Sequence, residues 1–170
     1  MNKLEEKKSP EIKQVKPSRL TVRRMVIDDL KHIMKMMSQF AQETRQILGE
    51  KDLEEIGLAA VNLFSQQDEK KGNDILVAEM GSVVGCIWYQ TAERLYGFPK
   101  AVMLMQHFYV KPKYRGQGVS DALYDEVIRI AGLLKVDAIE HTTEENAIHI
   151  QKFLERRQFN KEMCVFRRLM

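Results

Sequence analysis

The chain has 170 residues, of which 44% are hydrophobic and 30% charged, and its 27 basic and 24 acidic side chains give a net charge of +3. This length predicts one domain, with a core large enough to need no disulfide or metal. The small, mixed charge does not indicate a nucleic-acid partner, and no apolar run approaches the roughly 20 residues that span a bilayer. Lys3, Lys7 and Lys8 are not followed by the apolar segment of a secretory leader, so we expect a cytoplasmic protein.

The cysteines and histidines indicate neither a disulfide framework nor a metal centre. Cys86 and Cys164 lie in separate apolar runs without CxxC spacing, which is typical of packed thiols in a reducing compartment. The four histidines form no recognised ligand spacing, so we expect no metal.

The N-terminal third predicts a tail, a strand and two helices. Residues 1–18 are rich in Lys, Glu, Ser and Pro and have too few apolar residues to bury a face, so they predict a flexible charged tail before a folded domain over 19–170. A strand is expected over 20–25, and Asp28 or Asp29 can cap the helix that follows. Helical spacing predicts that this helix buries Leu30, Ile33, Met34, Met37 and Phe40. A second helix is expected over 52–66.

The middle of the chain predicts three strands. Gly81 and Ser82 supply a tight turn between β-branched runs over 75–80 and 83–90, which is typical of a hairpin. A loop over 91–100 then leads to a strand over 101–110.

The C-terminal third of the sequence predicts the rest of a mixed α/β sheet. A helix is predicted from 119 to about 134, a strand over 136–143, a helix over 146–157 and a closing strand over 163–169. Strands alternate with helices in this half, and a hairpin precedes it, so the sheet contains both parallel and antiparallel pairs.

The turn over 115–120, Arg-Gly-Gln-Gly-Val-Ser, indicates an anion site. Glycines let a ligand approach the backbone, and the first turn of the following helix leaves N–H donors unpaired beside its positive dipole end. Arg115 adds a planar cation. A P-loop would need Lys-Ser or Lys-Thr after the glycines, and a dinucleotide fingerprint would need a third glycine.

These residues resemble the acyl-CoA pyrophosphate loop of the GNAT superfamily of N-acetyltransferases. The family pattern is [Q/R]-x-x-G-x-[G/A] after a strand ending in V-x-P, and here Val110 and Pro112 precede Arg115-x-x-Gly118-x-Ser120. Ser120 replaces the usual small residue. The order of elements also matches over about 19–170, which implies a single-domain, mostly antiparallel sheet flanked by helices, with a V-shaped split that holds acyl-CoA.

The resemblance implies a cofactor site for acetyl-CoA as co-substrate. Its pantetheine arm would pair with the backbone of Phe108, Tyr109 and Val110, as a peptide adds to a strand edge. Its diphosphate would lie on the turn that follows, and the asparagine that often begins the last helix is retained as Asn146. The turn residues expected to bind the cofactor are Arg115, Gly116, Gln117, Gly118, Val119 and Ser120.

The catalytic residues depart from the family pattern. Leu154 stands where a tyrosine often protonates the departing thiolate, Gln158 replaces a glycine, and Gln106 replaces a frequent glutamate. The amine must still lose a proton, and the candidates for the base are Glu140 first, then His141, His107 or ordered water. Strand alternation places Glu140 and His141 on opposite faces, so only one of them can face the site.

The sequence therefore predicts direct transfer of an acetyl group from acetyl-CoA to a primary amine on a small molecule or peptide, without an acyl-enzyme. One alternative is a catalytically impaired domain that binds acyl-CoA or a protein partner without turnover, and another is an assembly component that binds no acetyl-CoA. Phe166, on the predicted last strand, and Met170, directly after it, could pair across a homodimer.

Overall fold

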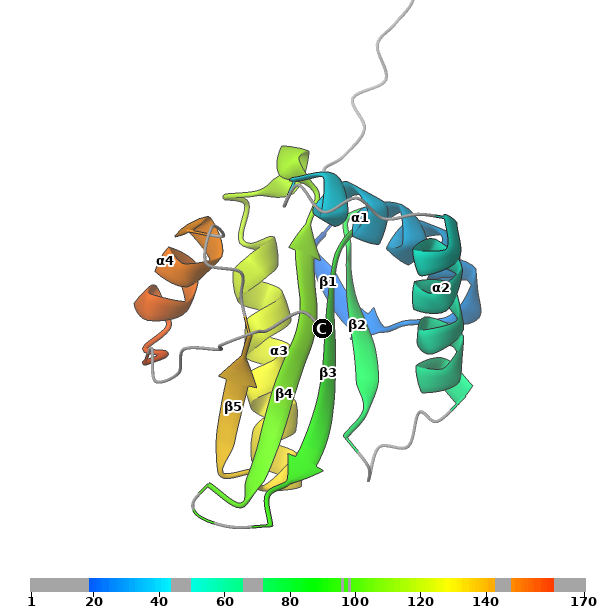
Figure 1. The fold of residues 1–170 in the computed structure, drawn as a ribbon. Coiled ribbons are helices and arrows are strands. Elements are labelled where there is room, and N and C mark those ends of the chain that lie inside the picture. The colour runs from blue at the N-terminus through cyan, green and yellow to red at the C-terminus, as the bar shows by residue number, and fades with distance from the viewer. Residues whose placement is uncertain are drawn as a thin grey trace, which may run out of the picture.

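The computed structural model describes residues 19–43, 50–65, 72–95, 97, 99–142 and 148–160. The predicted tail, the predicted last strand and Asn146 lie outside the described residues. Within these described ranges, five strands form one sheet in chain order, with antiparallel pairs from β1 to β4 and a parallel pair between β4 and β5 (Figure 1). The strands are β1 Thr21–Arg24, β2 Asp74–Glu79, β3 Val83–Glu93, β4 Ala101–Val110 and β5 Ala138–His141. The predicted mixed, mostly antiparallel sheet is confirmed.

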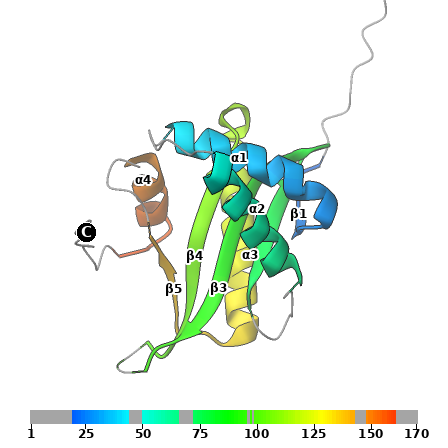
Figure 2. The same ribbon diagram turned by 45° about the vertical axis from the view of Figure 1, so that its right-hand side comes forward.

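Two layers of helix cover the sheet. In Figures 1 and 2, α1 and α2 lie on one face, α3 lies on the other, and α4 stands beside the β5 edge. The helices are α1 Leu30–Glu43, α2 Glu50–Ser65, α3 Val119–Leu134 and α4 Ile148–Arg156, and short 3-10 turns cover Ile27–Asp29 and Pro112–Tyr114. Among the described residues, no helix combines the length and apolar character needed to cross a membrane.

The bounds of the described elements agree with the sequence to within two residues, except in the central loop. β4 and α3 begin and end where the sequence predicts. β3 continues to Glu93, which pairs with Ala101, so the connection to β4 begins at Arg94 rather than at residue 91. The antiparallel ladder extends the hairpin because each added pair satisfies further backbone groups.

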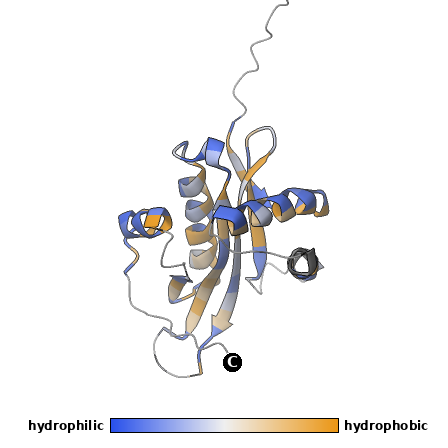
Figure 3. Cartoon of the chain, turned by 45° about the horizontal axis from the view of Figure 1, so that its top comes forward, coloured by the Kyte–Doolittle hydropathy of each residue, from blue (hydrophilic) through white to orange (hydrophobic). Residues whose placement is uncertain are grey.

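The two faces of the sheet bury separate apolar clusters. The α3 face includes Leu76, Ile87, Met103 and Leu123, and the α1 face includes Ile33 and other residues of α1, β2 and β3. Figure 3 shows the hydrophobic residues concentrated along the strands, between helices whose outer sides are hydrophilic.

One core prediction is wrong in the first helix. Met34 is only partly buried, whereas Met36 has no exposed surface and Met37 is 3% exposed. Met34 instead contacts α2, where its sulfur lies 3.1 Å from the point that a Cβ on Gly57 would occupy. Because α1 contacts both the sheet and α2, its buried surface is wider than one stripe.

Cys86 is a packed thiol, as the sequence predicts. It is a buried free cysteine on β3, and burial raises its thiol pKa to about 12. A thiol in this state is a poor nucleophile near neutral pH.

α4 ends at a residue that is normally glycine. Gln158 has a left-handed φ of 65°, the Gln158 N–H donates to the Glu155 carbonyl at 3.0 Å, and the Phe159 N–H donates to the Leu154 carbonyl at 3.0 Å. This is a Schellman C-cap, which favours glycine because a Cβ is crowded in the left-handed region.

We therefore expect Gln158→Gly to raise the free energy of unfolding by about 0.5–1 kcal/mol. Gln158→Ala is the matched control, since alanine keeps the Cβ and brings no such relief. Urea unfolding of both variants measures the difference, and equal stability of the two would contradict the explanation.

Candidate functional site

The sheet splits between β4 and β5. Their parallel pairing runs from Val102 opposite Ala138 to Met105 opposite His141, where β5 ends. β4 continues for another five residues to Val110, so this part of its edge has no β5 partner. The arrangement gives the V-shaped opening that the family resemblance implies, with its apex at Met105 and His141.

A β-bulge lies at the apex. Trp88 of β3 pairs with His107 and the next residue, Tyr89, pairs with Met105, so Gln106 is an extra residue in β4. Bulges bend a strand and re-aim its side chains. Gln106 is exposed, and the His107 ring packs on the Trp88 ring with 5.3 Å between centroids.

Aromatic rings fill the base of the opening on the α3 side. The Phe108 ring meets the Tyr124 ring edge-on at 5.1 Å and stacks on the Phe153 ring at 5.9 Å. Tyr124 comes from α3 and Phe153 from α4, so the rings join both helices to β4. Such ring pairs add to the free energy of apolar burial, here at the point where the strands diverge.

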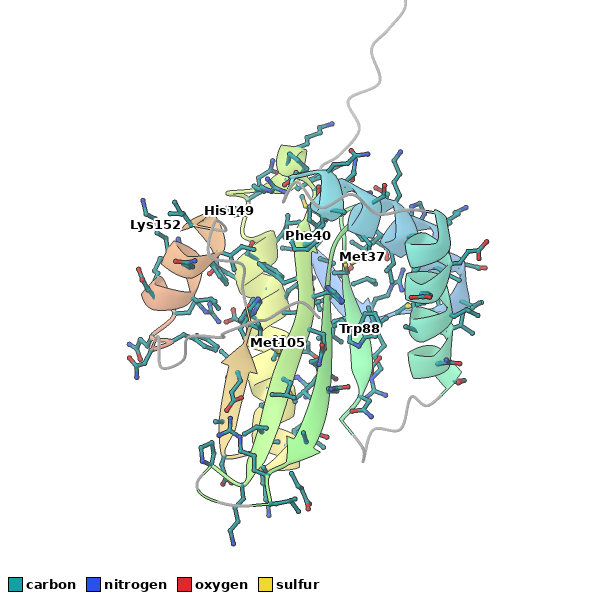
Figure 4. The ribbon with its side chains drawn as sticks, viewed as in Figure 1. Met37, Phe40, Trp88, Met105, His149 and Lys152 are labelled. Atoms are coloured by element: carbon teal, nitrogen blue, oxygen red, sulfur yellow. The ribbon has the colours of Figure 1, made fainter. Side chains whose placement is uncertain are left out.

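A cavity of about 240 Å³ lies between the end of β4, α4 and the end of α1. Figure 4 shows Phe40 of α1 near the upper part of β4, and His149 on α4. The residues lining the cavity are Phe40, Glu43, Phe108, Tyr109, Val110, Arg115, Ser120, His149, Ile150 and Phe153. Five of these were predicted to bind the cofactor, namely Phe108, Tyr109, Val110, Arg115 and Ser120.

The glycine turn exposes its backbone beside this cavity. Gly116 and Gly118 have φ values of 75° and 80°, and an added Cβ at either would have no atom within 4 Å. Gly118 is the N-cap of α3 and no side chain caps that helix start, so the first-turn N–H groups can receive an anion. Gln117 is exposed at the turn, with its amide donating to the Lys113 carbonyl at 2.8 Å.

Two residues anchor the turn rather than face the cavity. Val119 is 1% exposed and packs in the α3-side core. Gly85 of β3 lies beneath it: a Cβ on Gly85 would come within 3.2 Å of Val119 Cγ1 and 3.1 Å of the Tyr109 carbonyl oxygen. The lack of a side chain at Gly85 therefore lets the end of β4 and the start of α3 lie close together.

Arg115 contacts protein groups at the cavity. Its Nε donates to the Val110 carbonyl at 2.9 Å, and another guanidinium nitrogen donates to Glu43 Oε2 at 2.6 Å. The second Glu43 oxygen accepts from the Tyr109 hydroxyl at 2.6 Å, and the guanidinium carbon lies 5.4 Å from the centre of the Tyr109 ring. We call Glu43, Tyr109 and Arg115 the clasp. Sequence reasoning missed Glu43, which lies 66 positions before Tyr109 and carries no motif.

Glu140 and His141 lie on opposite faces, as strand alternation predicts. Glu140 forms an ion pair with Arg94, whereas His141 Nδ1 is hydrogen-bonded to the Tyr124 hydroxyl of α3. Glu140 therefore lies on the α1 side of the sheet, the side on which His107 packs against Trp88. Burial lowers the pKa of His107 below its ordinary value. His107 is therefore neutral at pH 7.

The position of the missing tyrosine is part of the core. Leu154 is 7% exposed and packs in the α3-side cluster, while its neighbour Phe153 lines the cavity. Within the described part of the chain, no three His, Cys, Asp or Glu side chains form a group that could hold a metal ion.

The clasp places a carboxylate beside the proposed diphosphate position. Glu43→Gln removes this charge and weakens the hold on Arg115, so we expect the Kd for acetyl-CoA to fall about fivefold, which corresponds to about 1 kcal/mol. Calorimetry measures the change, and Glu55→Gln on the exposed side of α2 removes an equal charge as control. Weaker binding by Glu43→Gln would show that the clasp supports the cofactor site.

Comparisons with known proteins agree with this geometry. The acetyltransferase (GNAT) domain profile matches residues 71–161, more than half of the chain. A search of the curated proteins finds no match.

Solved structures with the same fold include a transcriptional regulator from Bacillus halodurans C-125, with 19% identity and a TM-score of 0.74 over 89% of this chain and 100% of that one. AAC(6')-Iy, in complex with the bisubstrate analogue CoA-S-monomethyl-acetylneamine, has 17% identity and a TM-score of 0.71. The match covers 90% of this chain and 99% of that one. Glucosamine-6-phosphate N-acetyltransferase from Arabidopsis thaliana has 10% identity and a TM-score of 0.70, and the match covers 89% of this chain and 99% of that one. With the split sheet and the glycine turn, the matching profile shows that this chain belongs to the GNAT family of acetyltransferases.

Proposed function

We propose that the protein transfers the acetyl group of acetyl-CoA directly to a primary amine of a small molecule or peptide. The observation that carries this proposal is the β4 edge from Gln106 to Val110, which has no strand partner on its β5 side among the described residues and leads away from a turn with two left-handed glycines. Acetyl-CoA has the two matching parts, an amide-containing arm and a diphosphate. The arm would pair with the backbone of the β4 edge, and the diphosphate would bind the backbone N–H groups of the turn.

The cofactor's orientation follows from the turn. With the diphosphate at Gly116 to Ser120, the arm runs along β4 from Val110 toward Met105. Five strand residues span about 17 Å, so the arm brings its thioester close to the apex. The Val110 carbonyl accepts from Arg115 Nε, and a cofactor amide would replace that donor.

The reaction needs positioning and two proton transfers. An alkylamine of pKa about 10.4 is mostly protonated near neutral pH, so a base or water chain must first remove one proton. The neutral amine nitrogen then bonds to the thioester carbon, the C–S bond breaks with its electron pair going to sulfur, and the proton that the nitrogen loses as the amide forms goes to the leaving sulfur or to water. Holding the two reactants in contact supplies a large part of the rate.

His107 is the candidate best suited to act as base, and Glu140 is second. His107 lies next to the bulge and burial keeps it neutral. Glu140 lies on the same side of the sheet, but its carboxylate is paired with Arg94. His141 faces α3, and Tyr124 occupies its Nδ1.

An amine acceptor is supported by two structural neighbours. The ligand in the AAC(6')-Iy complex is a CoA conjugate of an acetylneamine, and the Arabidopsis enzyme is a glucosamine-6-phosphate N-acetyltransferase. The Arabidopsis name describes acetyl transfer to the nitrogen of an amino sugar, so amino sugars belong in an acceptor screen beside polyamines and peptides.

Gly118→Trp tests the cofactor site. A side chain there stands in open space beside the helix start, so we expect acetyl-CoA binding to be lost while the fold remains. Gly97→Trp is the matched control, since Gly97 has a φ of 85° and equally open surroundings in the distant β3–β4 loop. Calorimetry with acetyl-CoA measures both variants, and wild-type affinity in Gly118→Trp would reject the site.

Acceptor-dependent thiol release tests turnover. Incubation with acetyl-CoA and a mixed amine and peptide library should release free CoA thiol only when an acceptor is present. Binding without release, across the whole library, would contradict the proposed transfer.

The pH dependence tests the base. The lowered His107 pKa predicts that the rate falls only below the ordinary histidine pKa of about 6.5, because protonation then removes the base. His107→Ala should lower the single-turnover rate about 100-fold and remove this acid limb. A Glu140→Gln variant with the larger loss would assign the role to Glu140.

A further inference from the structure

Tyr124 and His141 form a buried pair beneath the apex of the split. Tyr124 comes from the second turn of α3 and has no exposed surface, and His141 is the last residue of β5. The Tyr124 hydroxyl is hydrogen-bonded to His141 Nδ1, and the two rings stack with 6.0 Å between centroids and 15° between planes. The pair is thus held by both a hydrogen bond and ring stacking.

The contact sets which ring nitrogen of His141 carries the proton. Burial raises the Tyr124 pKa, so the phenol stays protonated, and burial together with His107 lowers the His141 pKa to about 4, so the imidazole is neutral at pH 7. In the described part of the chain, Tyr124 makes no other hydrogen bond. The buried phenol proton therefore goes to Nδ1, because leaving it unpaired costs free energy. The proton of the ring is then on Nε2.

His141 also lies where the reactive end of the cofactor is proposed to arrive. It pairs with Met105 at the last position of the β4–β5 ladder, and from the next residue of β4 no described strand pairs on this side. Its ring stands edge-on to Phe108, 6.2 Å away, and Phe108 lines the cavity. Tyr124 is fully covered but His141 keeps some exposure, and Nδ1 is the nitrogen that is covered by the phenol.

We propose that His141 donates a hydrogen bond from Nε2–H to the thioester sulfur of bound acyl-CoA, with Tyr124 as the positioning residue that fixes this tautomer. This inference rests on the proposed acetyl transfer. As the C–S bond breaks, negative charge develops on the sulfur, and the hydrogen bond from His141 Nε2–H stabilises it. His141 keeps its proton throughout. The first amine proton goes to the separate base on the opposite face, and the second, lost as the amide forms, goes to the leaving sulfur or to water.

This role fits the departure of the chain from the family pattern. Leu154 supplies no donor, and its side chain lies in the core. A neutral imidazole N–H is a hydrogen-bond donor rather than an acid at pH 7, and this is sufficient for a thiolate, since a thiol of pKa about 8.5 is a good leaving group. In this chain the proposed donor to the sulfur is therefore His141 of β5, positioned by Tyr124 of α3, and not a tyrosine of α4.

The first experiment reads the tautomer in the protein without cofactor. Nitrogen-15 NMR of His141 at pH 7 should show a protonated Nε2 and an unprotonated Nδ1, and Tyr124→Phe should shift the ring toward a mixture of tautomers. A protonated Nδ1 in the wild-type protein would overturn the proposal.

The second experiment adds ligands to the same sample. Acetyl-CoA should shift the His141 Nε2–H resonance, whereas adenosine 3′,5′-bisphosphate, which lacks the arm and thioester, should leave it unchanged. An equal shift with both ligands would overturn the contact with the thioester. Absence of any acetyl-CoA binding by calorimetry would instead reject the proposed function itself.

The third experiment separates catalysis from structure. His141→Gln keeps an N–H donor near the Nε2 position and should retain the single-turnover rate within about threefold, whereas His141→Asn should lose about 100-fold. Tyr124→Phe should lose about tenfold. The Kd for acetyl-CoA should stay within twofold in all three, with native thermal unfolding as the check of folding. Equal losses in His141→Gln and His141→Asn, or parallel losses of affinity, would assign His141 a structural role only.

Discussion

The parallel ladder between β4 and β5 stops at Met105 and His141, and the cavity, the free strand edge and the proposed chemistry all depend on this stop. Backbone groups that lose a strand partner must find another, so an unpaired edge inside a fold is normally costly. Here the bulge at Gln106 bends β4 away, and the rings of Phe108, Tyr124 and Phe153 fill the wedge on one face. The interior is packed where the strands diverge, so the opening does not depend on a bound molecule to hold it apart.

Close packing in the same region fixes the end of β4 and the start of α3, which flank the glycine turn. Gly85 lets Tyr109 and Val119 approach β3, so the end of β4 and the start of α3 form one rigid corner. The turn between them is short and exposed, but both of its ends are anchored by buried residues. An anion site made of backbone N–H groups needs this rigidity, because its donors cannot adjust independently of the chain.

The sequence predicted the elements well where local pattern decides them. Helical spacing and left-handed glycines are local signals, so β4, α3 and the turn at 115–120 were correctly placed. The bulge at Gln106 was not predicted, because one extra residue leaves the apolar pattern of β4 nearly unchanged. Glu43 was missed because its partners lie far along the chain, and Tyr124 because an aromatic residue in an α3 stripe resembles any core residue. Asn146 lies outside the described residues, and its predicted role stays a prediction.

The clasp has a consequence for selectivity among anions. A free arginine beside a helix start would attract orthophosphate, nucleotides and other small anions. Because Arg115 is already paired with Glu43 and with the Val110 carbonyl, a small anion must compete with those contacts and gains nothing from the strand edge. At the proposed site, a molecule that reaches both the glycine turn and the β4 edge would regain the contacts that it displaces. We therefore expect the site to select long ligands over small anions.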